Sequence, residues 1–146
     1  MKARNLMTEH AQAVLPSDPV SHAAALMRDS DVGFIPVVDD RESRRLVGVI
    51  TDRDIAIRHV ANAHGDDCRV DQHMTASDLV TVPADADINA VQEVMREHQV
   101  RRVPVTDGEG RILGVIAQAD VATKGDRDRE TGQLVEDISQ PSRIPR

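Results

Sequence analysis

The chain contains an internal repeat, and this feature restricts its fold more than any other. Gly48 recurs as Gly114 and Pro36 as Pro104, so the offset stays near 67 residues and drifts only at loops. The six paired blocks are Met7-Thr8 with Met74-Thr75, Leu15-Pro16 with Val82-Pro83, Ala25-Leu26-Met27-Arg28 with Glu93-Val94-Met95-Arg96, Phe34-Ile35-Pro36-Val37 with Arg102-Val103-Pro104-Val105, Leu46-Val47-Gly48-Val49-Ile50 with Ile112-Leu113-Gly114-Val115-Ile116, and Asp54-Ile55-Ala56 with Asp120-Val121-Ala122. A register held over six blocks indicates two copies of one structural unit.

Each copy has the hydrophobic pattern of strand, helix, strand, strand and helix, which predicts a mixed α/β fold of two β-α-β-β-α units. Neither unit is long enough to bury both helices alone, so the two are expected to pack as one body. The expected elements are a strand ending at Leu15-Pro16, a helix starting at Pro19 and capped by Ser17 or Asp18, strands at 34–38 and 46–50 and a helix from near Asp52; then a strand near 79–82, a helix over 88–95 and strands at 103–106 and 112–116. The residues expected inside are Met27, Ile50, Ile55, Val60, Met95 and Ile116.

The predicted boundaries follow the repeat. Residues 1–62 are assigned to the first unit with its lead-in, 63–73 to a linker and 74–124 to the second unit. Residues 125–146 are polar and of mixed charge, and they contain Pro141 and Pro145. This composition favours a mobile tail, although Leu134, Val135 and Ile138 could instead form a helical turn that docks.

Composition excludes several classes of function. The chain has 40% hydrophobic and 29% charged residues, a net charge of -7, and Phe34 as its single aromatic residue. The charge disfavours binding to nucleic-acid phosphates, and the lack of aromatic residues disfavours base stacking. No run approaches 18 apolar residues, so no membrane span is expected, and the start lacks the apolar core of a signal peptide. A single cysteine, Cys68, allows no internal disulfide and favours a cytoplasmic location.

Two motifs carry a family resemblance. Residues 48–54, Gly-Val-Ile-Thr-Asp-Arg-Asp, and residues 114–120, Gly-Val-Ile-Ala-Gln-Ala-Asp, each follow a strand with a Pro-Val pair. Over residues 1–124 the chain resembles a tandem pair of CBS domains, or Bateman module, and is similar to the small stand-alone bacterial pairs of hypoxic and stress responses. The resemblance implies pairing of the units around a pseudo-twofold axis. It also implies a cleft for AMP, ADP, ATP or S-adenosylmethionine, and homodimerisation. The apolar stripes of the helices at residues 20–30 and 88–98 also favour a homodimer.

Thr51 and Asp54 permit two interpretations. By themselves they form a Ser/Thr-x-x-Asp capping box, in which each side chain satisfies a backbone donor at the start of a helix. The resemblance instead implies that Thr51 binds phosphate and that Asp54 accepts the ribose hydroxyls.

Arg101 and Arg102 are two adjacent cations in an apolar strand. Surface ion pairing is one explanation for them. The family places this strand at the cleft that holds the Thr/Asp motif of the other unit, so the resemblance implies that both arginines face phosphates bound at Thr51 and Asp54. Val80, Thr81 and Val100 would line the same cleft. The second cleft would offer Asp120, Gly33 and Phe34, and it has Ala117 in place of the hydroxyl, so it suits an uncharged nucleoside or nothing.

No metal or catalytic site is predicted. His59, His64, Cys68 and His73 lie near one another in sequence, but their spacing matches no known zinc pattern, so solvated histidines are expected. Cys68 is either a reactive thiol or a small buried residue. No catalytic triad, metalloprotease or phosphate-loop pattern occurs. The sequence therefore favours a sensor or adaptor that needs no cofactor, binds an adenine nucleotide and acts on an unknown protein partner, and not an enzyme. The alternative is a ligand-free interaction module stabilised by dimerisation.

Overall fold

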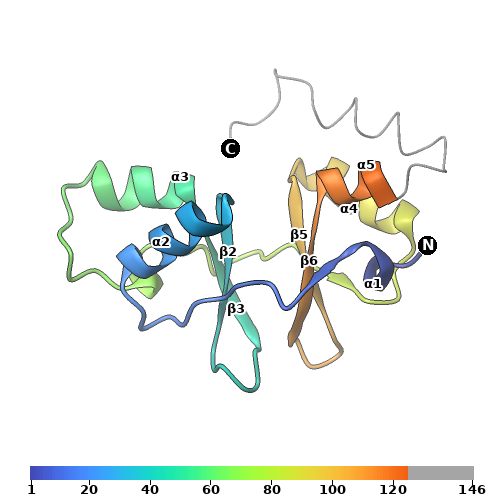
Figure 1. Cartoon of the computed structure of the whole chain (residues 1–146), viewed down its shortest axis with the longest axis horizontal. Helices are drawn as coiled ribbons and strands as arrows, with labels where there is room; N and C mark the ends of the chain where they lie inside the picture. Colours follow the sequence, from blue (N-terminus) through green and yellow to red (C-terminus); the bar gives the residue numbers. More distant parts are fainter. Residues whose placement is uncertain (125–146) are drawn as a thin grey trace. The chain divides into compact units, whose positions relative to one another are not determined.

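The protein consists of two compact units that are not continuous in sequence. The structure is a computed structural model, and it describes residues 1–124 (Figure 1). Among the described residues, one unit is Gln12–Leu79, and the other combines Met1–Ala11 with residues 80–124. The predicted tail at residues 125–146, with Leu134, Val135 and Ile138, lies outside the described residues. In the part that is described, no helix is both long and apolar enough to cross a membrane.

The unit Gln12–Leu79 is built on an antiparallel hairpin. Its elements are α2 (Val20–Ser30), β2 (Phe34–Val38), β3 (Leu46–Thr51), α3 (Asp52–Asp54), the π-helix η1 (Ile55–Val60) and the short 3-10 helix η2 (Val70–Gln72). Val14 forms a parallel bridge to Val37, and Thr75 forms an antiparallel bridge to Val49. The core of this unit contains Val14, Ala23, Met27, Ile35, Val37, Ile50 and Val70.

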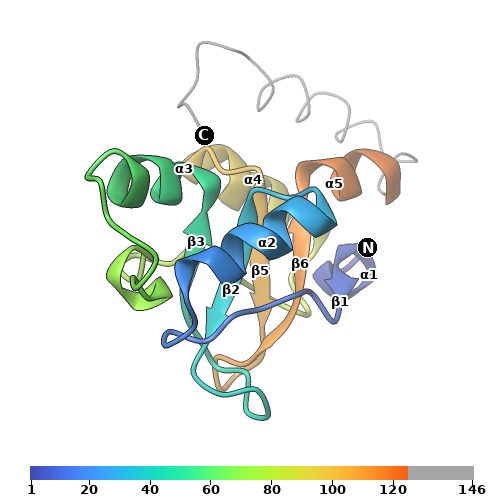
Figure 2. The same ribbon diagram turned by 60° about the vertical axis from the view of Figure 1, so that its left-hand side comes forward.

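The second unit has a four-stranded sheet in the order β1-β6-β5-β4. Figure 2 labels β1, β5 and β6 of this sheet. Its elements are α1 (Ala3–Leu6), β1 (Thr8–Glu9), β4 (Val82–Pro83), α4 (Ile88–His98), β5 (Arg102–Thr106), β6 (Ile112–Ala117) and α5 (Gln118–Lys124). Strand β4 pairs in parallel with β5, and β1 pairs antiparallel with β6. The core contains Ala3, Leu6, Val82, Ile88, Val91, Met95, Val103, Val105, Ile116 and Val121.

Both units have the same topology, which confirms the mixed α/β fold. The parallel contact of Val14 with Val37 matches that of Val82 with Val105, and the antiparallel contact of Thr75 with Val49 matches that of Thr8 with Val115. Met27, Ile50, Met95 and Ile116 are buried as expected.

The unit boundaries differ from the predicted ones because the lead-in segments are exchanged. Met7 and Thr8 precede the first repeat but pack on β6 of the second, while Met74 and Thr75 precede the second repeat but lie on β3 of the first. A Cβ on Gly114 would lie 2.6 Å from the Thr8 carbonyl oxygen, and one on Gly48 would lie 2.8 Å from Met74 Sδ. The repeated glycine thus lets a crossing segment approach the strand closely.

Several local expectations were wrong. Val60 is 65% exposed because the second helix widens into a π-helix, in which Ile55 and His59 are the partly buried residues. The strand expected at Leu15-Pro16 is a single bridge at Val14, and the one expected near residues 79–82 is the two-residue β4. Neither Ser17 nor Asp18 caps α2. Pro19 holds the N-cap position, and the Asp18 carboxylate accepts a hydrogen bond from the Leu15 backbone N–H at 2.8 Å.

Candidate functional site

Thr51 and Asp54 form a closed capping box where β3 meets α3. The Thr51 Oγ1 accepts the Asp54 backbone N–H at 3.1 Å, and Asp54 Oδ2 accepts the Thr51 backbone N–H at 3.0 Å. The hydroxyl proton of Thr51 and the second carboxylate oxygen of Asp54 are left over by this arrangement. That oxygen lies 3.8 Å from Arg58 Nε. The capping interpretation is therefore confirmed, and both side chains keep polar atoms that a ligand could use.

The second repeat has half of this arrangement. Asp120 Oδ2 accepts the Ala117 backbone N–H at 2.8 Å, as Asp54 does in the first repeat. Ala117 has no hydroxyl, so the reciprocal bond is missing. Asp120 is partly buried and stabilises the start of α5.

The Thr51 motif lies beside strand β2 of its own unit. Phe34 is directly opposite Thr51 in the ladder, and the Gly33 carbonyl accepts the Asp52 backbone N–H at 3.0 Å. A Cβ on Gly33 would lie 2.6 Å from the Asp52 carboxylate, so a side chain larger than hydrogen would displace that group. The structure thus brings Gly33 and Phe34 together with Thr51.

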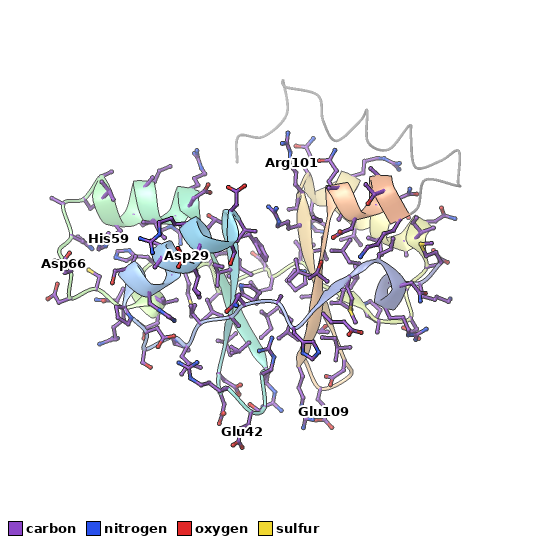
Figure 3. All side chains as sticks on the ribbon, viewed as in Figure 1. Asp29, Glu42, His59, Asp66, Arg101 and Glu109 are labelled. Atoms are coloured by element: carbon purple, nitrogen blue, oxygen red, sulfur yellow. The ribbon has the colours of Figure 1, made fainter. Side chains whose placement is uncertain are left out.

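Arg101 and Arg102 lie beside the motif of the second unit, which runs from Ala117 to Asp120. Arg102 is opposite Ala117, and the Arg101 carbonyl accepts the Gln118 backbone N–H at 2.8 Å. Arg101 is exposed (Figure 3), and Arg102 is half-buried. Within residues 1–124 neither guanidinium forms an ion pair, so the structure there gives no support to surface pairing. The predicted grouping of these arginines with Thr51 and Asp54 joins residues of different units and stays a prediction.

The remaining predicted site residues lie in the second unit. Val80 and Val100 are partly buried and pack against its core, whereas Thr81 is exposed. The two valines therefore have a packing role whether or not they also touch a ligand.

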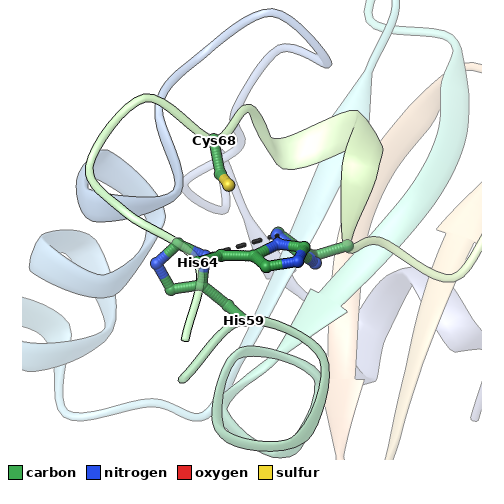
Figure 4. A group of neighbouring side chains, drawn as sticks. His59, His64 and Cys68 are labelled. Carbon is green, nitrogen blue, oxygen red and sulfur yellow. Dashed lines mark hydrogen bonds between the residues drawn. The ribbon is translucent and has the colours of Figure 1, made fainter. Parts of the chain in front are cut away.

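The sequence did not predict the close approach of His59, His64, Cys68 and His73, here called the His/Cys cluster (Figure 4). One potential ligand atom from each residue lies within 4.8 Å of all the others. His73 Nε2 is 3.3 Å from His59 Nδ1 and also 3.3 Å from His64 Nδ1. His73 is 2% exposed, so the expectation of solvated histidines is wrong there.

Three separate backbone segments position the His/Cys cluster. His59 lies on η1, and the His64 backbone N–H returns to the His59 carbonyl at 3.1 Å. The Cys68 carbonyl accepts the Val20 backbone N–H at the start of α2, and the His73 backbone N–H bonds to the Val70 carbonyl at the end of η2. The spacing of five, four and five residues has no helical or strand period, so no sequence signal marked this group.

Burial lowers the pKa of His73 below its ordinary value, and the nearby His59, His64 and Arg58 lower it further. The His73 imidazole is therefore neutral near pH 7. A neutral imidazole keeps one ring nitrogen with a free lone pair, which is the form that accepts a hydrogen bond or binds a metal ion.

Comparison with known proteins decides the family. The CBS domain model matches residues 3–59 and 70–125, once for each repeat. The chain belongs to the CBS domain family. Hypoxic response protein 1 of Mycobacterium tuberculosis is 36% identical over 120 residues, which cover 82% of this chain and 82% of that protein.

Solved CBS structures agree with the fold. The crystal structure of Hypoxic Response Protein I with two coordinated zinc ions matches with a TM-score of 0.75 at 34% identity, covering 84% of this chain and 98% of that one. The complex of CBSX2 with AMP matches with a TM-score of 0.74 at 24% identity, covering 86% and 96%. At that identity the second likeness shows the fold alone.

Proposed function

We propose that this CBS pair is a regulatory adenosyl-ligand sensor and not an enzyme. The observation that carries the proposal is the motif of Thr51 and Asp54, which ends a strand, begins a helix and keeps a hydroxyl and a carboxylate oxygen for a ligand. A carboxylate accepts both hydroxyls of a ribose, and a hydroxyl binds phosphate. The AMP complex of CBSX2, a protein of the same fold, supports the proposal. The candidates are AMP, ADP, ATP and S-adenosylmethionine.

Arg101 and Arg102 are proposed to contribute positive charge for the ligand's phosphates, with Val80, Thr81 and Val100 contributing to the adenine pocket. The chain carries a net charge of -7, so an anionic ligand requires local cations. Asp120, Gly33 and Phe34 are proposed to serve a weaker site for an uncharged nucleoside, because Ala117 lacks the hydroxyl that Thr51 provides.

Calorimetry on three variants tests these roles. A charge-assisted hydrogen bond contributes about 1.5–3 kcal/mol, so Asp54→Ala should weaken binding by about one to two decades. Asp120→Ala is the matched control, because it removes the equivalent bond to a backbone N–H and should leave phosphorylated ligands nearly unaffected. Arg102→Ala should weaken AMP or ATP strongly and adenosine little. The assignment is reversed if Asp120→Ala abolishes binding and Asp54→Ala does not.

A ligand-free interaction module is the second candidate. The capping box of Thr51 and Asp54 favours it, because that geometry is explained by helix capping alone. A thermal-shift panel separates the two functions, since a ligand at 100 times its dissociation constant stabilises the fold by about 2.7 kcal/mol. If no adenosyl ligand shifts the melting temperature, the interaction module is the better account.

We also propose that the chain works as a cytoplasmic homodimer that acts on a protein partner in a stress response. Ile57 is 47% exposed and Val60 65% exposed on one helix, which leaves apolar surface for association. The name of hypoxic response protein 1 supports the stress role, and the single Cys68 supports a reducing compartment. Sedimentation with and without nucleotide should show a dimer at micromolar concentration, and a monomer under both conditions would refute the assembly.

A further inference from the structure

We propose that the His/Cys cluster is a closed, four-coordinate zinc site inside the unit Gln12–Leu79. The donor set is three imidazoles and one thiol, and histidine nitrogen and cysteine sulfur are the ligand atoms that zinc prefers in proteins. Four protein ligands leave no open position for a substrate, so the site serves folding and not catalysis.

The spacing of the nitrogens fits a tetrahedral ion. With Zn–N bonds of about 2.0–2.1 Å, two ligands of a regular tetrahedron lie about 3.3–3.4 Å apart. His73 Nε2 lies 3.3 Å from the Nδ1 atoms of both His59 and His64. A Zn–S bond of about 2.3 Å requires a nitrogen-to-sulfur separation of about 3.6 Å. Since the Cys68 sulfur lies within 4.8 Å of every nitrogen, a side-chain adjustment of about 1 Å suffices.

Hydrogen bonding explains this geometry poorly. A ring nitrogen has either one in-plane lone pair or one proton, yet two other ring nitrogens each lie 3.3 Å from His73 Nε2. The ring of His73 is inclined by 75° to that of His59 and by 49° to that of His64, so the rings do not stack. A single cation between the nitrogens would use the lone pairs of all three rings at once.

The surroundings suit a permanent ion. His73 is almost completely buried, so an ion bound to its ring would be shielded from solvent on that side. The thiolate of Cys68 would offset one of the two charges of the ion. The nearby cation Arg58 donates to the carbonyls of His73 and Met74 at 3.2 and 3.1 Å, and it lies 3.8 Å from the Asp54 carboxylate, which partly offsets its charge.

Zinc at this position would join the two ends of the segment between η1 and η2. His59 precedes the segment and His73 follows it, with His64 and Cys68 within it. Closing a loop with an ion that the unfolded chain cannot hold stabilises the folded state. The site is thus expected to hold η1, which carries His59, against the backbone at His73.

The experiment uses the full chain, stripped with a chelator and titrated with zinc alone, without nucleotide. The parent should bind one zinc ion per chain and melt at a higher temperature with the metal. His64→Gln and Cys68→Ser should each lower the zinc association constant by more than about a hundredfold, beyond the 10–100-fold cost of losing an outer-shell partner. His98→Gln is the control, because this exposed histidine lies on α4 of the other unit, and it should stay within about twofold.

Cobalt provides a readout that needs no variant. The parent loaded with cobalt should show the visible bands of a tetrahedral ion and the charge-transfer band of a thiolate ligand. The proposal is overturned if the parent binds no zinc at micromolar concentration, if both ligand variants keep the parent affinity, or if cobalt shows an octahedral spectrum without a thiolate band. If half an equivalent of zinc binds per chain and the chain dimerises only with zinc, the ion is shared between two chains. This result would overturn the proposal of a site within one unit.

Discussion

Replacing Gly114 by alanine tests how the N-terminal segment is held. The added Cβ would lie 2.6 Å from the Thr8 carbonyl oxygen and 2.9 Å from Met7 Cγ. Because the first of these is a backbone atom in the β1–β6 ladder, no rotamer change removes the clash. Overpacking of this kind costs about 1–3 kcal/mol. Complete detachment would expose the fully buried Leu6, which alone costs about 1.5–3 kcal/mol, together with Ala3 and the ladder bonds. A local shift is therefore cheaper, and the segment should stay docked.

Two matched variants make this argument quantitative. Gly48→Ala places its Cβ 2.8 Å from the flexible Met74 Sδ and 3.0 Å from the Thr75 carbonyl oxygen, so it should cost less than Gly114→Ala. Gly108→Ala meets nothing within 4 Å and should be neutral or slightly stabilising. The predicted order of destabilisation is Gly114, then Gly48, then Gly108.

Thermal unfolding and hydrogen exchange measure the effect. At about 2–4 °C per kcal/mol for a chain near this size, Gly114→Ala should lower the melting temperature by about 2–12 °C. Amide exchange at Thr8 and Glu9 should accelerate without reaching the unprotected rate, because the segment remains docked. The reasoning is refuted if Gly114→Ala and Gly108→Ala melt within about 1 °C of each other, or if Gly48→Ala is the more damaging change.

Three further predictions concern stability and titration. Asp87→Ala should cost about 1 kcal/mol in urea unfolding, because Asp87 Oδ1 accepts the Ala90 backbone N–H at 2.9 Å and caps α4; an unchanged midpoint would contradict this. Gln92→Leu should be neutral or stabilising by about 1 kcal/mol, since the buried Gln92 Nε2 has no partner among residues 1–124; a clear loss of stability would reveal a partner. Ser43→Ala should raise the pKa of Asp39 toward its ordinary value in an NMR titration, because the Ser43 hydroxyl donates to that carboxylate at 2.8 Å and holds its pKa down; an unmoved pKa would assign the effect to the Arg45 backbone N–H.

Local patterns predicted most elements correctly. The helix at Ile88–His98 and the strands around Pro36 and Pro104 follow from short-range periodicity and turn residues. The capping box at Thr51 and Asp54 also follows from four adjacent residues. Val60 was misplaced because the register of a helix that widens into a π-helix depends on tertiary packing.

The candidate ligand residues were predictable as residue types but not as a group. The Thr/Asp pair and the two arginines were found by comparing the repeats and by the family resemblance. Ladder register then placed Arg102 beside Ala117 and Phe34 beside Thr51, each within its own unit. Strand pairing of this kind depends on contacts between residues far apart in sequence, and one sequence read by itself does not give them.

The sequence by itself determined the duplication, through its repeated blocks. It also determined the order of the main strands and helices and most of their buried faces, because these depend on periodicities of two and 3.6 residues. Only the tertiary structure decided which lead-in segment pairs with which hairpin, since Thr8 lies beside Val115 and Thr75 beside Val49. It also decided the His/Cys cluster, whose members come from a helix, a loop and the end of a 3-10 helix. Both features arise from long-range contacts, whose stability comes from burial in the whole fold and leaves no periodic trace in the chain.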